Sequence, residues 1–232
     1  MLKISKFFEA FLELVYPRLC AGCKGASTAP ICKECLSKME MVDETSCRYC
    51  GRPTEYEVEE CRDCRGKKLY FDRARALFVF EGVGKDVIHS FKYDRETRLA
   101  PIIAEQIIDR NWYIDLDLVT FVPLFNRKKI ERGYDQAELI AKEIGRQSGT
   151  QTARLLKRDR NTKEQNKLDL LERRKNVDGA FSSTDRYSVL GKSILLVDDV
   201  YTTGRTISEC AKILKAEGAR KVYVAVAAKT II

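Results

Sequence analysis

Four pairs of cysteines with the pattern Cys-x-x-Cys constrain the first part of this 232-residue chain more than any other feature. Eight of the nine cysteines lie between residues 20 and 64. The segment 17–68 has little hydrophobic periodicity, and a segment of this kind needs a cross-link or a metal ion in place of a core. Since no signal-peptide pattern is present, we expect a cytoplasmic protein, in which clustered thiols bind metal rather than form disulfides.

Two residues between a pair of cysteines form a tight turn that directs both sulfurs to one tetrahedral ion. Eight thiolates therefore predict two structural zinc centres with four ligands each. If the pairs combine in sequence order, the ligands are Cys20, Cys23, Cys32 and Cys35 in the first centre and Cys47, Cys50, Cys61 and Cys64 in the second. Interleaved pairing is an alternative, because every spacer is short enough to close a site. An iron–sulfur cluster is a weaker alternative, because the spacing resembles neither common ferredoxin arrangement.

From residue 69 onward, apolar strands alternate with segments of helical spacing. The predicted strands are residues 74–80, 118–122, 193–197 and 221–227, and the predicted helices are residues 84–93, 97–113, 133–148 and 203–217. This alternation predicts an α/β fold with an open, mostly parallel sheet and helices on both faces. We expect three parts: an amphipathic helix at 1–16, a small cysteine-rich double zinc-ribbon domain at 17–68 and the α/β domain at 69–232. No apolar run is long enough to span a membrane.

The stretch ILLVDDVYTTGRT, residues 194–206, combines an acidic strand end with a turn that opens a helix. Ligands bind at the carboxyl ends of strands in open α/β sheets. The N–H groups and dipole of the helix N-terminus suit a phosphate monoester. The adjacent carboxylates of Asp198 and Asp199 can accept two neighbouring hydroxyls, as on a ribose, or hold hydrated Mg²⁺. A capped helix after an acidic strand end is the simpler interpretation, but a cap seldom needs two acids followed by TTGRT.

This stretch resembles the 5-phosphoribosyl-1-pyrophosphate (PRPP) motif of type I phosphoribosyltransferases. The resemblance implies that Asp198 and Asp199 contact the ribose hydroxyls and Mg²⁺. The residues implied to hold the 5-phosphate are Thr202, Thr203, Gly204, Arg205 and Thr206. Further segments resemble the ComF family of competence-associated, phosphoribosyltransferase-like proteins, namely FKY at 91–93, VPL at 122–124, RGYDQ at 132–136 and NVDGAF at 176–181.

The family resemblance covers nearly the whole chain, because the cysteine region is similar too. It implies a type I phosphoribosyltransferase-like fold with two structural zinc ions, and Mg²⁺ bound together with PRPP. It also implies a role in DNA uptake during natural transformation, beside the DNA-uptake helicase and replication-restart proteins. The chain departs from the family pattern at Phe125 and Asn126, where His-Pro is frequent, and at Asp135, where Asn is usual. Asp135 could repel pyrophosphate or bind metal.

Basic residues gather in two segments of the second half. Arg127, Lys128 and Arg132 follow the second strand, where the resemblance implies the pyrophosphate loop. Residues 154–175 contain nine Lys or Arg against four Asp or Glu and resemble the mobile loop that closes over PRPP. Candidate contacts there are Arg160, Thr162 and Gln165. The charge suits a pyrophosphate, the backbone of single-stranded DNA, or merely a solvated loop.

Three functions remain in competition at this point. The first is a PRPP- and Mg²⁺-binding protein of the competence system. The second is an active phosphoribosyltransferase that acts on an unidentified nucleobase, although the sequence displays no recognisable acceptor pocket. The third is a PRPP-independent adaptor for single-stranded DNA or proteins. The net charge of +8 belongs almost entirely to residues 69–232, which contain 30 Lys or Arg and 23 Asp or Glu and so contribute +7.

Overall fold

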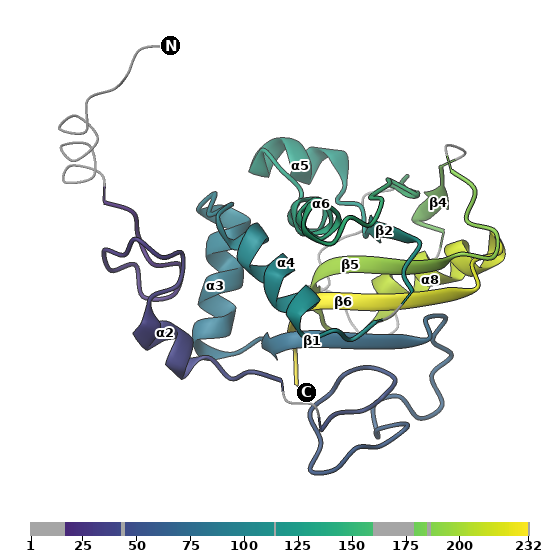
Figure 1. The fold of residues 1–232 in the computed structure, drawn as a ribbon, viewed down its shortest axis with the longest axis horizontal. Coiled ribbons are helices and arrows are strands. Elements are labelled where there is room, and N and C mark those ends of the chain that lie inside the picture. Colours follow the sequence, from purple (N-terminus) through teal and green to yellow (C-terminus); the bar gives the residue numbers. More distant parts are fainter. Residues whose placement is uncertain (1–16, 43–44, 114, 160–178, 185–186, 232) are drawn as a thin grey trace.

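A four-stranded parallel sheet forms the centre of the protein in a computed structural model, which describes residues 17–42, 45–113, 115–159, 179–184 and 187–231 (Figure 1). The strand order is β1-β6-β5-β2, and all three pairings are parallel. The strands are β1 (Arg73–Val79), β2 (Leu118–Phe121), β5 (Ser193–Tyr201) and β6 (Lys221–Lys229). A separate antiparallel pair consists of β3 (Leu156–Arg158) and β4 (Phe181–Ser183). The predicted parallel sheet is confirmed.

Helices cover both faces of the sheet, as the sequence predicts (Figure 1). One face carries α3 (Gly82–Tyr93), α4 (Leu99–Asp109) and α6 (Gln136–Ser148), and the other carries α8 (Arg205–Ala216). Two shorter helices lie outside these layers: α2 (Lys33–Lys38) contacts α3, and α5 (Asn126–Arg132) has no buried residue. Alternate side chains of β5 point to opposite faces. Ile194 and Leu196 pack with α8, whereas Leu195 and Val197 pack with α3, α4 and α6. Burial on both faces explains why this strand is a continuous apolar run.

Two boundaries differ from the prediction in ways that shape the site. β5 extends four residues beyond the predicted 193–197, because it continues to pair with β6 as far as Tyr201. The predicted helix 133–148 instead begins at Gln136, because the Asp135 side chain accepts a hydrogen bond from the Glu138 N–H and acts as its N-cap. The short helix α5 that precedes it was not predicted.

The chain between the two cysteine clusters runs along the outer edge of β1. The Val79 N–H donates to the Glu40 carbonyl and the Val42 N–H to the Leu77 carbonyl, both at 2.8 Å. These bonds satisfy backbone groups that an edge strand would otherwise expose. The two cysteine clusters consequently lie apart, the first beside α3 and the second beyond β1 (Figure 1).

The amphipathic helix predicted for 1–16 lies outside the described residues. None of the helices in the described part of the chain combines the length and apolarity that a bilayer crossing demands.

Candidate ligand site and metal centres

The structure gathers the cysteines into two groups of four, in sequence order. Within each group the sulfur atoms all lie within 4.8 Å of one another. The first group contains Cys20, Cys23, Cys32 and Cys35, and the second contains Cys47, Cys50, Cys61 and Cys64. All nine cysteines of the chain are free thiols. The described structure therefore has the sequential arrangement and not the interleaved one.

The sulfur positions fit tetrahedral zinc. Zn–S bonds of about 2.3 Å require sulfurs about 3.8 Å apart along the edges of a tetrahedron. The Sγ atoms of Cys23 and Cys32 are 3.9 Å apart in the first group. In the second group, Cys61 Sγ lies 3.7 Å from Cys50 Sγ and 3.8 Å from Cys64 Sγ. Each group can therefore hold one zinc ion at the sulfur positions of the structure.

Backbone donors around the sulfurs favour the thiolate form that a metal needs. The Cys32 N–H donates to Cys20 Sγ at 3.2 Å, and the Gly22 N–H donates to the same sulfur at 3.4 Å. Burial opposes ionisation, but these donors lower the pKa of Cys20 to about 6. In the second group the Cys61 N–H donates to Cys47 Sγ at 3.3 Å. Each group therefore combines four sulfurs with donors that stabilise negative charge.

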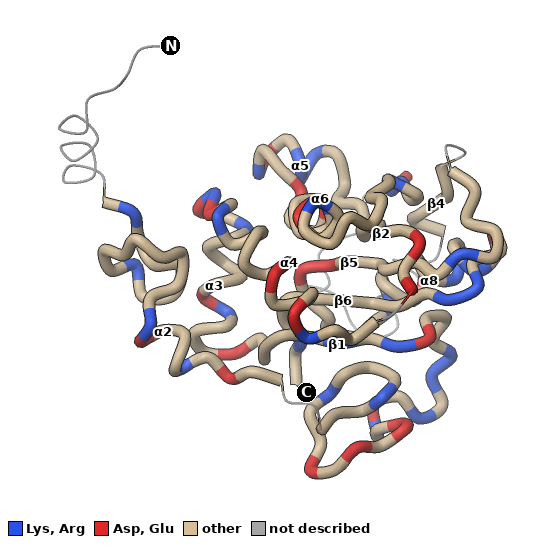
Figure 2. Tube along the Cα trace, in the orientation of Figure 1, with Lys and Arg blue, Asp and Glu red and all other residues tan. Residues whose placement is uncertain are grey.

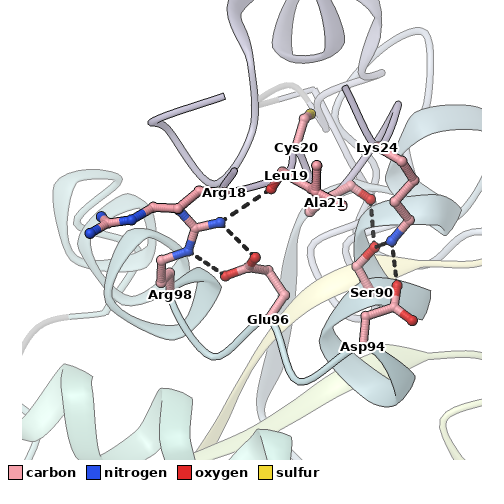
Figure 3. Close-up of a pocket in the computed structure, with 9 residues that line it drawn as sticks. All are labelled: Arg18, Leu19, Cys20, Ala21, Lys24, Ser90, Asp94, Glu96 and Arg98. Carbon is pink, nitrogen blue, oxygen red and sulfur yellow. Dashed lines mark hydrogen bonds and ion pairs between the residues drawn. The ribbon is translucent and has the colours of Figure 1, made fainter. Parts of the chain in front are cut away.

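The segment of the first cysteine group contacts α3 and the residues that follow α3 (Figure 3). Lys24 contacts Ser90 and Asp94, and the Ser90 hydroxyl donates to the Ala21 carbonyl at 2.6 Å. A cavity of about 570 Å³ lies between the two parts. Its charged groups pair with one another, as Arg98 does with Glu96 at 2.7 Å. We therefore interpret this cavity as part of the junction between the first ribbon and α3.

A second cavity, of about 310 Å³, lies at the carboxyl end of β5 and is lined by six of the thirteen predicted ligand-site residues. Its polar and charged lining residues are Lys92, Lys128, Arg132, Asp135, Gln136, Arg158, Asp198, Asp199, Thr202 and Thr206. They come from α3, α5, α6, β3, β5 and α8. Figure 2 shows the acidic end of β5 and the basic residues along α5. The topology thus brings carboxylates, hydroxyls and cations from distant parts of the sequence into one site.

The turn that we call the phosphate loop, residues 202–206, joins β5 to α8. Gly204 is the N-cap of α8 and has a φ of 74°, and among the described residues no side chain caps this helix. A Cβ at Gly204 would overlap the hydroxyl group of Tyr201, so both conformation and space require glycine there. The positive end of the α8 dipole therefore lies at this turn, where it favours an anion.

The two adjacent carboxylates face a lysine that the sequence analysis did not assign. Asp198 Oδ1 accepts a hydrogen bond from the Asp199 N–H at 2.9 Å. Asp199 Oδ2 lies 3.0 Å from Nζ of Lys92 on α3, and these two side chains are only 16% and 19% exposed. Because solvent screens this pair poorly, it is stronger than a surface ion pair. Lys92 thus supplies a positive charge at the carboxylates.

Crowding of acidic groups changes their protonation. Burial raises the pKa of Asp198 well above its usual range, and the negative charge of Asp199 acts in the same direction. Burial also raises the pKa of Asp135. Although Asp135 lines the cavity, its two oxygens accept hydrogen bonds from the N–H groups of Leu124 at 2.8 Å and Glu138 at 3.3 Å. Its departure from the family pattern is therefore explained by a structural role.

The basic residues divide into those that reach the cavity and those that pair elsewhere. Glu138 accepts ion pairs from Lys129 at 2.6 Å, Lys142 at 3.0 Å and Arg154 at 2.9 Å. Burial opposes its ionisation, but the hydrogen bonds from the two lysines lower the pKa of Glu138 to about 2. Arg127 pairs with Glu131 at 3.0 Å and does not line the cavity. The cations that do line it are Lys92, Lys128, Arg132 and Arg158.

Sequence reasoning found some of these residues and missed others. It did not assign a role to Lys92, although it noted the FKY segment that contains this residue. It also missed Arg158, which enters the site because β3 folds back against β4, and Gln136, whose side-chain amide donates to the Phe91 carbonyl at 3.1 Å. Arg160, Thr162 and Gln165 lie outside the described residues.

Comparison with known proteins identifies two families along the chain. Residues 11–65 match the double zinc ribbon domain, and residues 132–231 match the phosphoribosyl transferase domain. The first match contains all eight clustered cysteines, and the second contains the carboxylates, the phosphate loop and Arg158.

Curated relatives match over most of the chain. The DNA utilization protein YhgH of Escherichia coli (strain K12) is 28% identical over 222 residues, which cover 91% of this chain and 96% of that protein. Competence protein F of Haemophilus influenzae is 25% identical, covering 88% of this chain and 94% of that protein. Competence protein ComFC of Bacillus subtilis is 27% identical, covering 81% of this chain and 79% of that protein. These relatives therefore match this chain along most of both lengths.

The cysteine geometry predicts two zinc ions per chain. Denaturing the purified protein in the presence of a colorimetric zinc chelator should release two equivalents from the wild type and one from Cys64→Ser. Because structural zinc contributes about 10–16 kcal/mol of apparent binding free energy, the variant should also melt at a lower temperature. Release of fewer than two equivalents from the wild type would contradict the assignment.

The raised pKa of Asp198 predicts a pH-dependent effect of Asp198→Asn. The variant keeps an oxygen for the Asp199 N–H and removes a buried charge. Since the folded-state pKa lies above the ordinary value of 3.8, the wild type loses stability as pH rises through the folded pKa. Urea denaturation should find the variant more stable than the wild type at pH 7, with the difference shrinking towards pH 4. The exposed Asp86→Asn is the matched control, and a difference independent of pH would contradict the prediction.

Proposed function

Because this chain belongs to the ComF family of competence-associated proteins, in which a double zinc ribbon precedes a phosphoribosyltransferase domain, we propose that it binds PRPP with Mg²⁺ at the end of β5. The observation that carries the proposal is the meeting of the phosphate loop, the paired carboxylates and Lys128, Arg132 and Arg158 in one cavity. PRPP presents a phosphate monoester, a diol and a diphosphate, and the cavity offers a matching group for each.

The phosphate loop is the proposed site of the 5-phosphate. Thr202 and Thr206 line the cavity with hydroxyl groups, and the N–H groups of residues 203–206 and the dipole of α8 favour an anion. The candidate ligands Thr203, Gly204 and Arg205 belong to the same turn. This arrangement orients the ribose with its 2- and 3-hydroxyls towards Asp198 and Asp199, which are the nearest acceptors along β5.

The diphosphate is proposed to lie on the side of α5 and β3. Lys128, Arg132 and Arg158 provide positive charge there, and guanidinium groups bind phosphate oxygens through two parallel hydrogen bonds. Mg²⁺ would neutralise part of the diphosphate charge, with Asp199 and Asp198 as the carboxylates close enough to the cavity to hold it. Lys92 neutralises Asp199 and would remain beside the bound diol.

Catalysis would require an acceptor above the ribose in addition to these contacts. Phosphoribosyl transfer breaks the bond to the departing pyrophosphate through a cationic ribose, so positioning and electrostatics supply most of the acceleration. Phe80 and Lys92 line the cavity from the end of β1 and from α3. We therefore propose PRPP binding as the function, and keep transfer to a nucleobase as an alternative outcome.

Calorimetric titration tests the proposal. Wild-type protein should bind PRPP in the presence of Mg²⁺, and Asp198→Asn/Asp199→Asn should bind at least about tenfold more weakly, because each hydrogen bond to a charged group contributes about 1.5–3 kcal/mol. The exposed Asp86→Asn should bind as the wild type does. A wild type that does not bind PRPP would overturn the proposal. Pyrophosphate release on adding a nucleobase would favour the active transferase, and its absence would favour a regulatory role for PRPP.

A second candidate function, binding of single-stranded DNA, is favoured by an exposed aromatic residue beside the cavity. Tyr93 is 65% exposed, and the guanidinium carbon of Arg132 lies 5.2 Å from its ring centroid. Residues 93 and 132 are distant in the chain, so the sequence alone does not show that they meet. An exposed ring with a neighbouring cation is suited to base stacking and backbone contact. Such a protein would act in DNA uptake beside helicase or replication-restart proteins, with or without PRPP.

Base stacking on Tyr93 and neutralisation of DNA phosphates by basic residues predict different responses to salt. Tyr93→Ala should weaken binding of single-stranded DNA by about 1–3 kcal/mol for each base that no longer stacks, without changing the salt slope. Replacing basic residues of the 154–175 segment with Gln should reduce the slope by about 0.7 for each phosphate that is no longer neutralised. The replaced residues are Lys163, Lys167, Arg173, Arg174 and Lys175. Fluorescence anisotropy from about 50 to 200 mM salt measures the affinity for single-stranded DNA and its salt slope. If Tyr93→Ala and the Gln variant both bind DNA as the wild type does, this function is excluded.

A further inference from the structure

The second cysteine group lies next to the phosphate loop within one apolar core. Its four cysteines are buried and pack in the same cluster as Tyr201 at the end of β5 and Ile207 in α8. The first group differs, since Cys23 is exposed and Cys32 is half-buried, and its neighbour Ala21 packs on the opposite face of the sheet. Of the two centres, the second is therefore the one that is structurally continuous with the candidate ligand site.

A buried lysine of the sheet interacts electrostatically with the cysteines of the second centre. Lys229 is the last residue of β6 and is 3% exposed. Burial lowers the pKa of Lys229, while the negative charges of Cys50, Cys64 and Cys61 act against this. A zinc ion with four thiolates has a net charge of −2, so a buried ammonium group beside it compensates charge that an apolar core would otherwise disfavour. The second centre thus provides the electrostatic reason for a buried lysine at this position.

Tyr201 connects this lysine to the phosphate loop. The two residues are paired in the β5–β6 register, and Nζ of Lys229 lies 3.7 Å from the centroid of the Tyr201 ring. The hydroxyl group of Tyr201 lies against Gly204, where a Cβ would overlap it. Phe71 packs edge-on against the ring at 6.3 Å between centroids. Tyr201 is 5% exposed, so it can move only if one of these neighbours moves.

We propose that Lys229 and Tyr201 are positioning residues that couple the second zinc centre to the phosphate loop. The charge of the centre holds Lys229, the ammonium group of Lys229 holds the ring of Tyr201, and Tyr201 supports Gly204 in its left-handed conformation at the start of α8. The inference rests on the proposed function, since it concerns the affinity of this loop for PRPP. Because coupling is reciprocal, zinc at the second centre strengthens PRPP binding and PRPP strengthens binding of that zinc, which we expect to appear as slower release.

Lys229→Met tests the coupling, because it keeps the length of the side chain and removes the charge. Two measurements are made on each zinc-loaded full-length protein: the dissociation constant for PRPP with Mg²⁺, and the rate of zinc release to a colorimetric chelator. The variant should bind PRPP about tenfold more weakly, within the roughly 5- to 150-fold range of such couplings, and should release one of its two zinc ions faster. In the wild type, saturating PRPP should slow the release of one zinc ion and leave the other unchanged.

Lys212→Met is the matched control. Lys212 also lies over a tyrosine ring, 5.7 Å from the centroid of Tyr70, but its side chain is 50% exposed and it is on a later turn of α8. This variant should leave PRPP affinity and both zinc release rates at wild-type values. Tyr201→Phe is a second test that does not depend on the folding of Lys229→Met. It keeps the ring and removes only the hydroxyl group beside Gly204. It should melt at the wild-type temperature. Its affinity for PRPP should be at least about threefold lower than that of the wild type.

The outcomes separate this inference from the proposed function. If the wild type binds PRPP but Lys229→Met binds it equally well, the coupling is overturned and the proposed function stands, even if zinc release is faster. If PRPP leaves both zinc release rates of the wild type unchanged, the coupling is also overturned. If the wild type does not bind PRPP, the proposed function fails and the coupling fails with it.

Discussion

β5 and β6 pair in parallel along their lengths, and both the ligand site and its link to the metal centre depend on where this pairing ends. The pairing keeps Asp198 and Asp199 within a strand and stops with Tyr201 opposite Lys229. Ladder hydrogen bonds use the backbone donors of the strand, whereas the turn that follows Tyr201 lies outside the ladder. The phosphate loop is consequently short and directly attached to the sheet, which fixes its distance from the carboxylates.

Placement of charge decides the chemistry of the site more than the net charge of +8 does. Glu138 forms ion pairs with three basic groups near the cavity, and Lys92 is held by Asp199. Among the described residues, Lys128, Arg132 and Arg158 line the cavity on the side proposed for a diphosphate. In the same core, the negative charge of the second cysteine group acts on a buried lysine. Both sets of buried charges are compensated locally, which is the condition under which buried ions are tolerated.

Particular residues show how far the sequence alone could predict the structure. The cysteine spacing predicted both ligand groups, and the run before Asp198 predicted the central strand, because these signals are local and strong. The extension of β5 to Tyr201 depended on pairing with β6, which no local pattern reveals. Lys92 and Arg158 reach the site through tertiary packing of α3 and β3. The N-cap role of Asp135 was missed because the sequence analysis considered its charge and not the N–H groups that it would face.

Hydrogen exchange followed by mass spectrometry tests the central claim most directly, since it reports on the backbone N–H groups of the phosphate loop themselves. Peptides that span 202–206 should exchange more slowly when PRPP and Mg²⁺ are added together, while peptides from the first ribbon should be unaffected. Protection of this kind would mean that the loop at the end of β5 holds the ligand. Unchanged exchange in 202–206 at a PRPP concentration that saturates binding would contradict the account, because the phosphate would then be held elsewhere.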